Sequence, residues 1–422
     1  MGGALGRPDD CSGEVSRVKA RLRLLPEFLG VLAFGFVLYF AMLALRVALG
    51  PNGLLFSFET WLERAPDSAL YRFFWLLGDT TEPTFYASLL GGIGLLAFAF
   101  VAHLLYRSGS RWRGIPISYG TGLWPWIFVA SLIGLGLSVV LFGGLLSGGW
   151  VPTFVPFVSV PAAVVFVYGA GWKNALTGGI LGALVTFPVA YLVIQYVLAP
   201  LGLPGVIGAV TGMWLGAIIV FEVCRYLPWM RRGGAPPEGD EIPETGEGAD
   251  LPEPPPPVDP NRRGWFGRRV LADFSEAQFY GNEWASAGLL VGTLLSWVLN
   301  PLHPALGTDL LPAVILSQVL TAAVGVLLYY ERWRDLGWYP TFVPLVSVAP
   351  AMALAFGGTM QSILLGAVLG AIIAPPVAQF VIDRLPDHWH LFIGNTFSMA
   401  LCSLLVFLIL RYLLGFEVPT PS

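Results

Sequence analysis

The feature that most constrains this chain is a long segment that occurs twice. Residues 149–190 and 337–378 align without gaps at a constant offset of 188, and 20 of the 42 aligned positions are identical. The first copy opens GWVPTFVPFVSV and the second GWYPTFVPLVSV. A proline removes a backbone donor and disturbs the preceding helical turn. The sequence therefore predicts two related halves, each built around a proline-broken apolar helix.

Composition places both copies in a membrane. The chain is 55% hydrophobic and 12% charged, whereas soluble domains carry roughly 25% charged residues. Stretches of about 20 apolar residues are long enough to span a bilayer. We expect an all-α polytopic integral membrane protein with about 10–11 spans, one per apolar run. The runs fall at 28–49, 84–105, 122–146, 150–171, 175–199, 204–227, 284–301, 309–330, 338–357, 361–382 and 389–413.

The duplication extends beyond the proline segment. Asp79-x-x-Glu82 recurs as Asp273-x-x-Glu276 at an offset of 194, so each half has five membrane elements in the same order. An odd number of crossings per unit inverts the second copy. Arginines also concentrate in the loops that this topology places inside, as expected of cytoplasmic loops. If 150–171 and 338–357 are re-entrant instead of crossing, the unit has four crossings and this argument fails.

These patterns divide the chain into seven parts in a multi-pass protein of the cell (plasma) membrane, with both the N-terminus and the linker in the cytoplasm. The predicted parts are an N-terminal segment (1–27), an extra N-terminal transmembrane helix (28–49), an interfacial segment (50–78), a first membrane repeat (79–232), a disordered acidic Pro-rich linker (233–262), a second, inverted repeat (263–415) and a tail (416–422). The strong preference for arginine over lysine suggests a bacterial source.

The proline segments are the candidate substrate- or ion-binding site. Broken backbone within a membrane leaves carbonyl groups that protein, water, an ion or a solute must satisfy. Hydroxyl groups recur in the same stretch, and two inverted copies would bring them together near the midplane. The alternative is a pair of kinked helices whose hydroxyls bond their own backbone. The candidate residues are Thr153, Pro156 and Ser159 in the first copy and Thr341, Pro344 and Ser347 in the second.

The repeated acids allow two interpretations. An acid followed three residues later by glutamate, before an apolar run, is typical of a helix cap. Alternatively, Asp79 and Glu82 form one gate and Asp273 and Glu276 form another. Inversion would put the two pairs on opposite faces, too far apart for one site.

No catalytic constellation, phosphate-binding loop, metal-ligand cluster or nucleic-acid signature is evident, so we expect neither an enzyme nor a bound cofactor. Glu222 and Arg225 are predicted to form an ion pair, and Cys224 and Cys402 to be packing residues.

The preferred function is a secondary transporter or facilitator for a small neutral or weakly polar solute, because buried charges are few. Its partners would be membrane lipid and that solute, with the coupling cation and any homo-oligomer left open. A channel of the same architecture, or a membrane enzyme acting on lipid or polyprenyl substrates, is the alternative. Such an architecture is shared by unrelated proteins and names no substrate.

Overall fold

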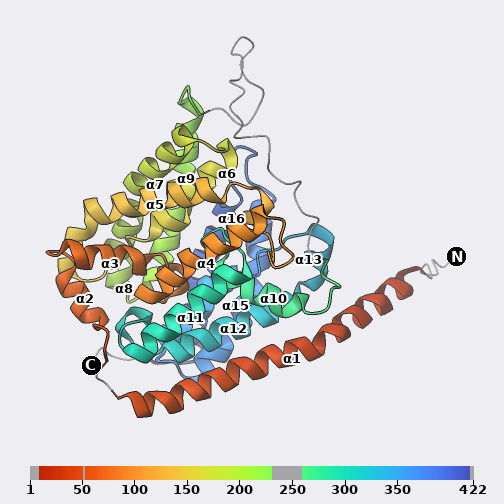
Figure 1. Ribbon diagram of the computed structural model, residues 1–422. Coiled ribbons are helices and arrows are strands. Elements are labelled where there is room, and N and C mark those ends of the chain that lie inside the picture. Colours follow the sequence, from red (N-terminus) through yellow and green to blue (C-terminus); the bar gives the residue numbers. More distant parts are fainter. Residues whose placement is uncertain (1–8, 51–52, 231–258, 419–422) are drawn as a thin grey trace, which may run out of the picture.

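The computed structural model describes residues 9–50, 53–230 and 259–418, with side chains from Arg21 onward. Within these ranges the chain is helical and contains no strand (Figure 1). The all-α prediction is therefore confirmed. The predicted linker 233–262 lies outside the described residues except for its last four positions.

In the described part of the chain, eight helices are long and apolar enough to cross a membrane, which supports a multi-pass membrane protein. Three further apolar helical segments are shorter: Val155–Tyr168, Glu283–Leu299 and Val343–Ala355. Together they account for all eleven apolar runs. The eight long segments are Arg21–Leu49, Leu89–Arg107, Trp124–Gly148, Trp172–Leu201, Gly205–Tyr226, Leu311–Leu328, Met360–Ile382 and Phe392–Leu413.

Helices follow one another in the same order in the two halves. The first half runs through α3 (Ala69–Asp79), α4 (Leu89–Arg107), α5 (Trp124–Phe142), α6 (Val160–Tyr168), α7 (Trp172–Val193) and α9 (Gly205–Tyr226). The second half runs through α10 (Trp265–Ala272), α11 (Glu283–Leu299), α12 (Leu311–Leu328), α14 (Val348–Ala355), α15 (Met360–Ile382) and α16 (Phe392–Leu408). The short helix α2 (Phe58–Arg64) precedes the first series, α8 (Ala199–Leu201) follows α7, and α13 (Tyr330–Leu336) follows α12.

The halves meet where α4 packs along α11 near the centre of the molecule (Figure 1). Gly94 of α4 faces Gly288 of α11, and a Cβ atom on either glycine would collide with the carbonyl oxygen of the other. These glycines are equivalent at the 194-residue offset. Gly91 faces Thr293 further along, so the two helices run antiparallel. Small residues allow this close approach of two backbones.

The halves also exchange loops. Ser118, in the loop between α4 and α5, donates its backbone N–H to the Tyr280 carbonyl at 2.9 Å. Ala305, in the loop between α11 and α12, donates to the Tyr86 carbonyl at 2.7 Å. Tyr86 and Tyr280 are equivalent residues. Each half therefore donates a backbone hydrogen bond to the segment that precedes α4 or α11 in the other half. These two hydrogen bonds fix the positions of both acidic motifs, which lie in those segments.

The N-terminal helix α1 (Asp9–Leu49) lies along the outside of the bundle and extends beyond it (Figure 1). It packs mainly against α12, where Gly35 faces Val319. Arg21 forms an ion pair with Glu331 at 3.3 Å. Much of its apolar surface is uncovered, as expected of a helix that faces lipid; Phe34, for example, is 64% exposed.

Each proline segment consists of two short pieces. Residues Val155–Val158 form a 3₁₀ turn before α6, and Val343–Val346 form the equivalent turn before α14. Ser159 and Ser347 separate the pieces and have extended φ angles of −140° and −147°. The two 3₁₀ turns pack against glycines of neighbouring helices: Pro156 contacts Gly134 of α5, and Pro344 contacts Gly370 of α15.

Candidate functional site

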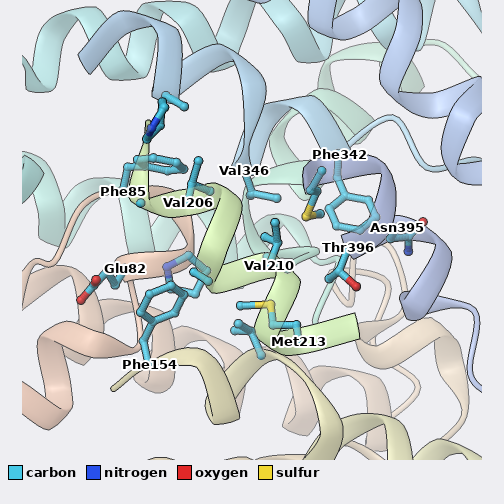
Figure 2. Close-up of a pocket in the computed structure, with 18 of the residues that line it drawn as sticks. Glu82, Phe85, Phe154, Val206, Val210, Met213, Phe342, Val346, Asn395 and Thr396 are labelled. Carbon is cyan, nitrogen blue, oxygen red and sulfur yellow. The ribbon is translucent and has the colours of Figure 1, made fainter. Parts of the chain in front are cut away.

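A cavity of about 510 Å³ is lined by residues of both halves (Figure 2). Its walls come from the segments before α4 and α11, the two proline segments, and the N-terminal parts of α9 and α16. Most of the lining is apolar or aromatic. Many lining residues are equivalent pairs from the two halves: Glu82 and Glu276, Pro83 and Ala277, Phe85 and Phe279, Phe154 and Phe342, Val158 and Val346, Val206 and Phe392, Ala209 and Asn395, Val210 and Thr396, and Met213 and Met399.

The polar groups of the lining are unevenly distributed. Asn395 and Thr396 of α16 stand where α9 has Ala209 and Val210. In Figure 2, Glu82 and Asn395 lie at opposite ends of the drawn pocket. Asn395 is 3% exposed, and its Oδ1 atom accepts no hydrogen bond from the described residues. Because an unpaired buried acceptor is costly, this atom is a candidate contact for a bound molecule.

The first acidic pair is held by the first proline segment. Thr153 donates its hydroxyl to Asp79 at 2.6 Å and accepts the Trp75 indole N–H at 2.9 Å. Trp150 donates its indole N–H to Glu82. Asp79 and Glu82 are 1% and 5% exposed. The duplicated W-x-P-T motif thus provides the donors that orient both carboxyl groups.

The second acidic pair has the same donors and an additional cation. Thr341 donates to Asp273 at 3.0 Å, and Trp338 donates to Glu276 at 2.9 Å. Arg269 of α10 bonds Asp273 at 2.7 Å and Glu276 at 2.6 Å. The guanidinium is 4% exposed, so this is a buried three-residue ion cluster.

The guanidinium of Arg269 also lies 4.7 Å from the ring centre of Trp333. Trp333 in turn donates its indole N–H to Thr341 at 3.3 Å. A planar, always-charged guanidinium suits such a buried site, since it can bond two carboxylates while stacking on an aromatic face.

The two pairs differ electrostatically. Asp79 is the last residue of α3, and the other three acids lie in the connections before α4 and α11, so all four are outside the eight long helices. Burial raises the pKa of Asp79 to about 7, although Thr153 opposes the rise. Burial, reinforced by the charge of Asp79, holds the pKa of Glu82 well above its usual range. Burial also raises the pKa of Asp273, to about 6, against the opposing effect of Arg269.

The structure brings the two acidic motifs to the same cavity. The sequence predicts that they lie too far apart for one site, whereas Glu82 and Glu276 both line these walls. The prediction is wrong because the segments before α4 and α11 pack side by side. Gln278 links them directly by donating its Nε2–H to the Thr80 carbonyl at 3.2 Å.

Neither acidic motif supplies the side-chain cap of the helix that follows it. Ser88 caps α4 by accepting from Gly91 N–H, and Asn282 caps α11 by accepting from the N–H groups of Trp284 and Ala285. The carboxyl groups instead point to the proline segments, through the hydrogen bonds described above.

The six proline-segment candidates lie behind the cavity wall. Thr153 and Thr341 bind the acids. The hydroxyls of Ser159 and Ser347 donate to the Val155 and Val343 carbonyls, each at 2.6 Å. Pro156 and Pro344 are buried among helices. The residues of these segments that line the cavity are apolar neighbours, including Phe154, Val158, Phe342 and Val346.

Two local predictions are confirmed. Glu222 and Arg225 form an ion pair at 3.0 Å, and Cys224 and Cys402 are both buried and unpaired. Glu222 also contacts His388 at 2.7 Å and thereby ties α9 to the loop before α16. Among the described residues, no group of three histidines, cysteines or acids is arranged to hold a metal ion.

The role of Arg269 was not predicted from the sequence. Its position four residues before Asp273 is the spacing at which side chains meet on a helix, so the signal was present. Tyr119 lines the cavity and Gln278 bonds the Thr80 carbonyl. Neither carried a local signal, because tertiary packing alone brings them to this site.

No protein-family model matches this chain, and no curated protein matches it.

Proposed function

We propose that this chain is a membrane transporter, either a secondary transporter or a facilitator, for a small neutral or weakly polar solute. The solute binds in the cavity between two inverted repeats. The observation that carries this proposal is the pairing of equivalent residues around one cavity, such as Phe154 with Phe342 and Met213 with Met399. Transporters with inverted repeats bind solute at the repeat interface, where rocking of one repeat against the other changes access.

Inversion is supported by the contact between α4 and α11. These helices are equivalent, run antiparallel and meet at the equivalent residues Gly94 and Gly288. A two-fold axis through that contact is perpendicular to both helices. With the helices crossing the bilayer, this axis lies in the membrane plane, as inverted repeats require.

The lining favours the proposed solute class. Aromatic and aliphatic side chains cover most of the walls, which suits the apolar surface of a small solute. Asn395 and Thr396 supply hydrogen-bonding groups at one end. The proline-broken segments position the wall: Thr153, Ser159 and their counterparts fix the turns that carry Phe154 and Phe342.

The test begins with a thermal-shift screen of purified protein against small neutral solutes, followed by uptake of any hit into proteoliposomes. Val210→Trp fills the cavity from α9, while Val223→Trp places the same side chain on the exposed face of that helix, where Val223 is 40% exposed. We expect the first variant to lose both the thermal shift and uptake, and the second to keep both. Wild-type behaviour of Val210→Trp would contradict the proposed site.

Flux kinetics separate the alternatives. A transporter gives saturable uptake that internal solute stimulates by counterflow. A channel gives unsaturable flux at a high rate. A membrane enzyme would turn over a lipid or polyprenyl substrate and give no solute flux in liposomes.

A further inference from the structure

The first acidic pair is buried without a basic partner. None of the described lysines, arginines or histidines forms an ion pair with Asp79 or Glu82. The two carboxyl groups lie close enough to interact with one another. Two adjacent buried carboxylates repel and lack solvation, so they cannot both remain ionised at low cost.

Two acceptor atoms near this pair lack donors. Glu82 Oε2 accepts no hydrogen bond from the described residues, and neither does Gln278 Oε1. Gln278 is 1% exposed, and its amide is fixed at the carbonyl of Thr80, between the two acids in sequence. Buried acceptors are normally satisfied. A proton on the acidic pair converts an acceptor into a donor and reduces this deficit.

The second pair shows the same arrangement with one fixed positive charge beside it. Arg269 bonds both Asp273 and Glu276. The equivalent position in the first half holds Trp75, whose indole bonds Thr153 instead. The donors supplied by the duplicated Trp-x-Pro-Thr motif are otherwise the same. The duplication therefore contains one acidic pair with a fixed cation and one without.

We propose that Asp79 and Glu82 form a proton-binding site that exchanges one proton with the cavity through Glu82. The pair alternates between a neutral state with both carboxyl groups protonated and a state that has released one proton and carries a single negative charge. The Asp273–Glu276 pair does not take part, because Arg269 supplies the positive charge that a proton supplies in the first half.

A proton fits this site better than a metal ion. The two carboxyl groups each have one donor from the proline segment, and the described residues offer no third acid, histidine or cysteine there. A hard cation needs six or more oxygen ligands. A sodium ion is the alternative that the experiment below distinguishes.

The other titratable groups around the pair do not replace the missing cation. Those nearest in the fold include Glu276, which bonds Arg269 and Trp338, and Tyr119 in the cavity wall. Tyr86 donates to Gln318, His303 bonds the Phe56 carbonyl and the Leu89 N–H, and Arg72 bonds a carbonyl of the α2–α3 loop.

This inference rests on the proposed transport function for its biological meaning. A site that gains a proton from the cavity couples solute movement to a proton gradient if solute binding or repeat motion changes its affinity for the proton. The proton would thus be the coupling cation of a transporter for a neutral solute.

Infrared titration of purified protein tests the site without knowledge of the solute. As pH rises from about 5 to about 9, the wild type should convert one more protonated carboxyl group to carboxylate than the Asp79→Asn/Glu82→Gln double variant, in which Asp273 still titrates with its pKa of about 6. Trp75→Arg should lower the pH of this additional titration, because a nearby guanidinium favours the ionised acids. Glu331→Gln, at the surface partner of Arg21, should leave it unchanged.

The wild-type measurement can overturn the proposal even if a variant fails to fold, because absence of a titrating protonated carboxyl contradicts it. A wild-type titration in the folded Asp79→Asn/Glu82→Gln double variant overturns it as well. A titration suppressed by sodium chloride, but not by choline chloride, shows a sodium site instead. Solute flux without a carboxyl titration would support the transporter and contradict proton coupling. A carboxyl titration without solute flux would support the proton site and contradict the transporter.

Discussion

Arg269 occupies, in the second half, the position that Trp75 occupies in the first, four residues before the leading acid of the motif. Trp75 bonds the threonine of the proline segment, while Arg269 bonds both acids directly. The difference between tryptophan and arginine at this one position therefore leaves the first acidic pair without a cation and gives the second pair one.

Loss of Arg269 should destabilise the protein strongly. Arg269→Gln leaves Asp273 and Glu276 buried without a cation, and breaking a buried ion pair by removing one partner costs about 3–5 kcal/mol. We expect a large fall in the melting temperature of detergent-purified protein at neutral pH. Arg334→Gln is the matched control: its ion pair with Asp335 is at the surface, with Asp335 55% exposed, so its loss should cost at most about 1 kcal/mol. Equal effects of the two changes would contradict the buried cluster.

Stability should fall as pH rises across the range in which Asp79 is protonated only in the folded state. Burial raises the pKa of Asp79 from 3.8 to about 7, so between these values the folded state binds more protons than the unfolded state. The linkage relation then makes the free energy of unfolding decrease with rising pH. Melting temperatures from about pH 4 to about pH 7 should show a slope that Asp79→Asn reduces. An unchanged slope in that variant would assign the effect to other groups.

The close contact between α4 and α11 should not tolerate a side chain at Gly94 or Gly288. Gly94→Ala places a methyl group against the Gly288 carbonyl, and overpacking of this kind costs about 1–3 kcal/mol. Gly136→Ala on α5 meets no atom within 4 Å and should be neutral or slightly stabilising, because alanine favours helix. Thermal unfolding of both variants checks the contrast. A stable Gly94→Ala protein would place the helices further apart.

The proposed inversion predicts the sides reached by two insertions. Reporter tags placed after Arg232 and after Gly415 follow the last helix of each repeat, so they should be accessible from opposite sides of the membrane. Protease protection in oriented vesicles measures this directly. Access to both tags from one side would exclude inverted repeats.

Ser159→Ala and Ser347→Ala should alter solute uptake without lowering expression. Each hydroxyl bonds the carbonyl four residues earlier and holds the turn that carries a cavity-lining aromatic residue. Each substitution removes one hydrogen bond, worth about 1 kcal/mol, so folding should persist while KM changes. Thr211→Ala on α9 removes a comparable hydroxyl bond to the Ile207 carbonyl and serves as the control. If both serine variants give wild-type kinetics, the proline segments do not position the site.

Apolar runs and repeats could be found in the sequence because hydropathy and similarity are local properties. All eleven predicted runs are helical, but three are short. Local caps and breaks explain the difference: Asn282 begins α11, and Ser159 separates a 3₁₀ turn from α6. Such interruptions leave the hydropathy of a run almost unchanged.

The candidate site was only partly predictable. The proline motif identified the right segments, but Phe154 and Val158 line the cavity while Thr153 and Ser159 face inward to Asp79 and the backbone. That division depends on the turn geometry. The meeting of the acidic segments depends on loop exchange between halves, which no local pattern encodes.

The exchanged loops make the two halves dependent on one another. Tyr86 and Tyr280 each present a carbonyl to a backbone donor from the opposite half. One unit on its own would therefore lack the donor that binds the segment before its α4 or α11 helix. Each unit therefore depends on the other for this contact. The two units of the present chain, expressed as separate polypeptides, should consequently accumulate only when both are made in the same cell.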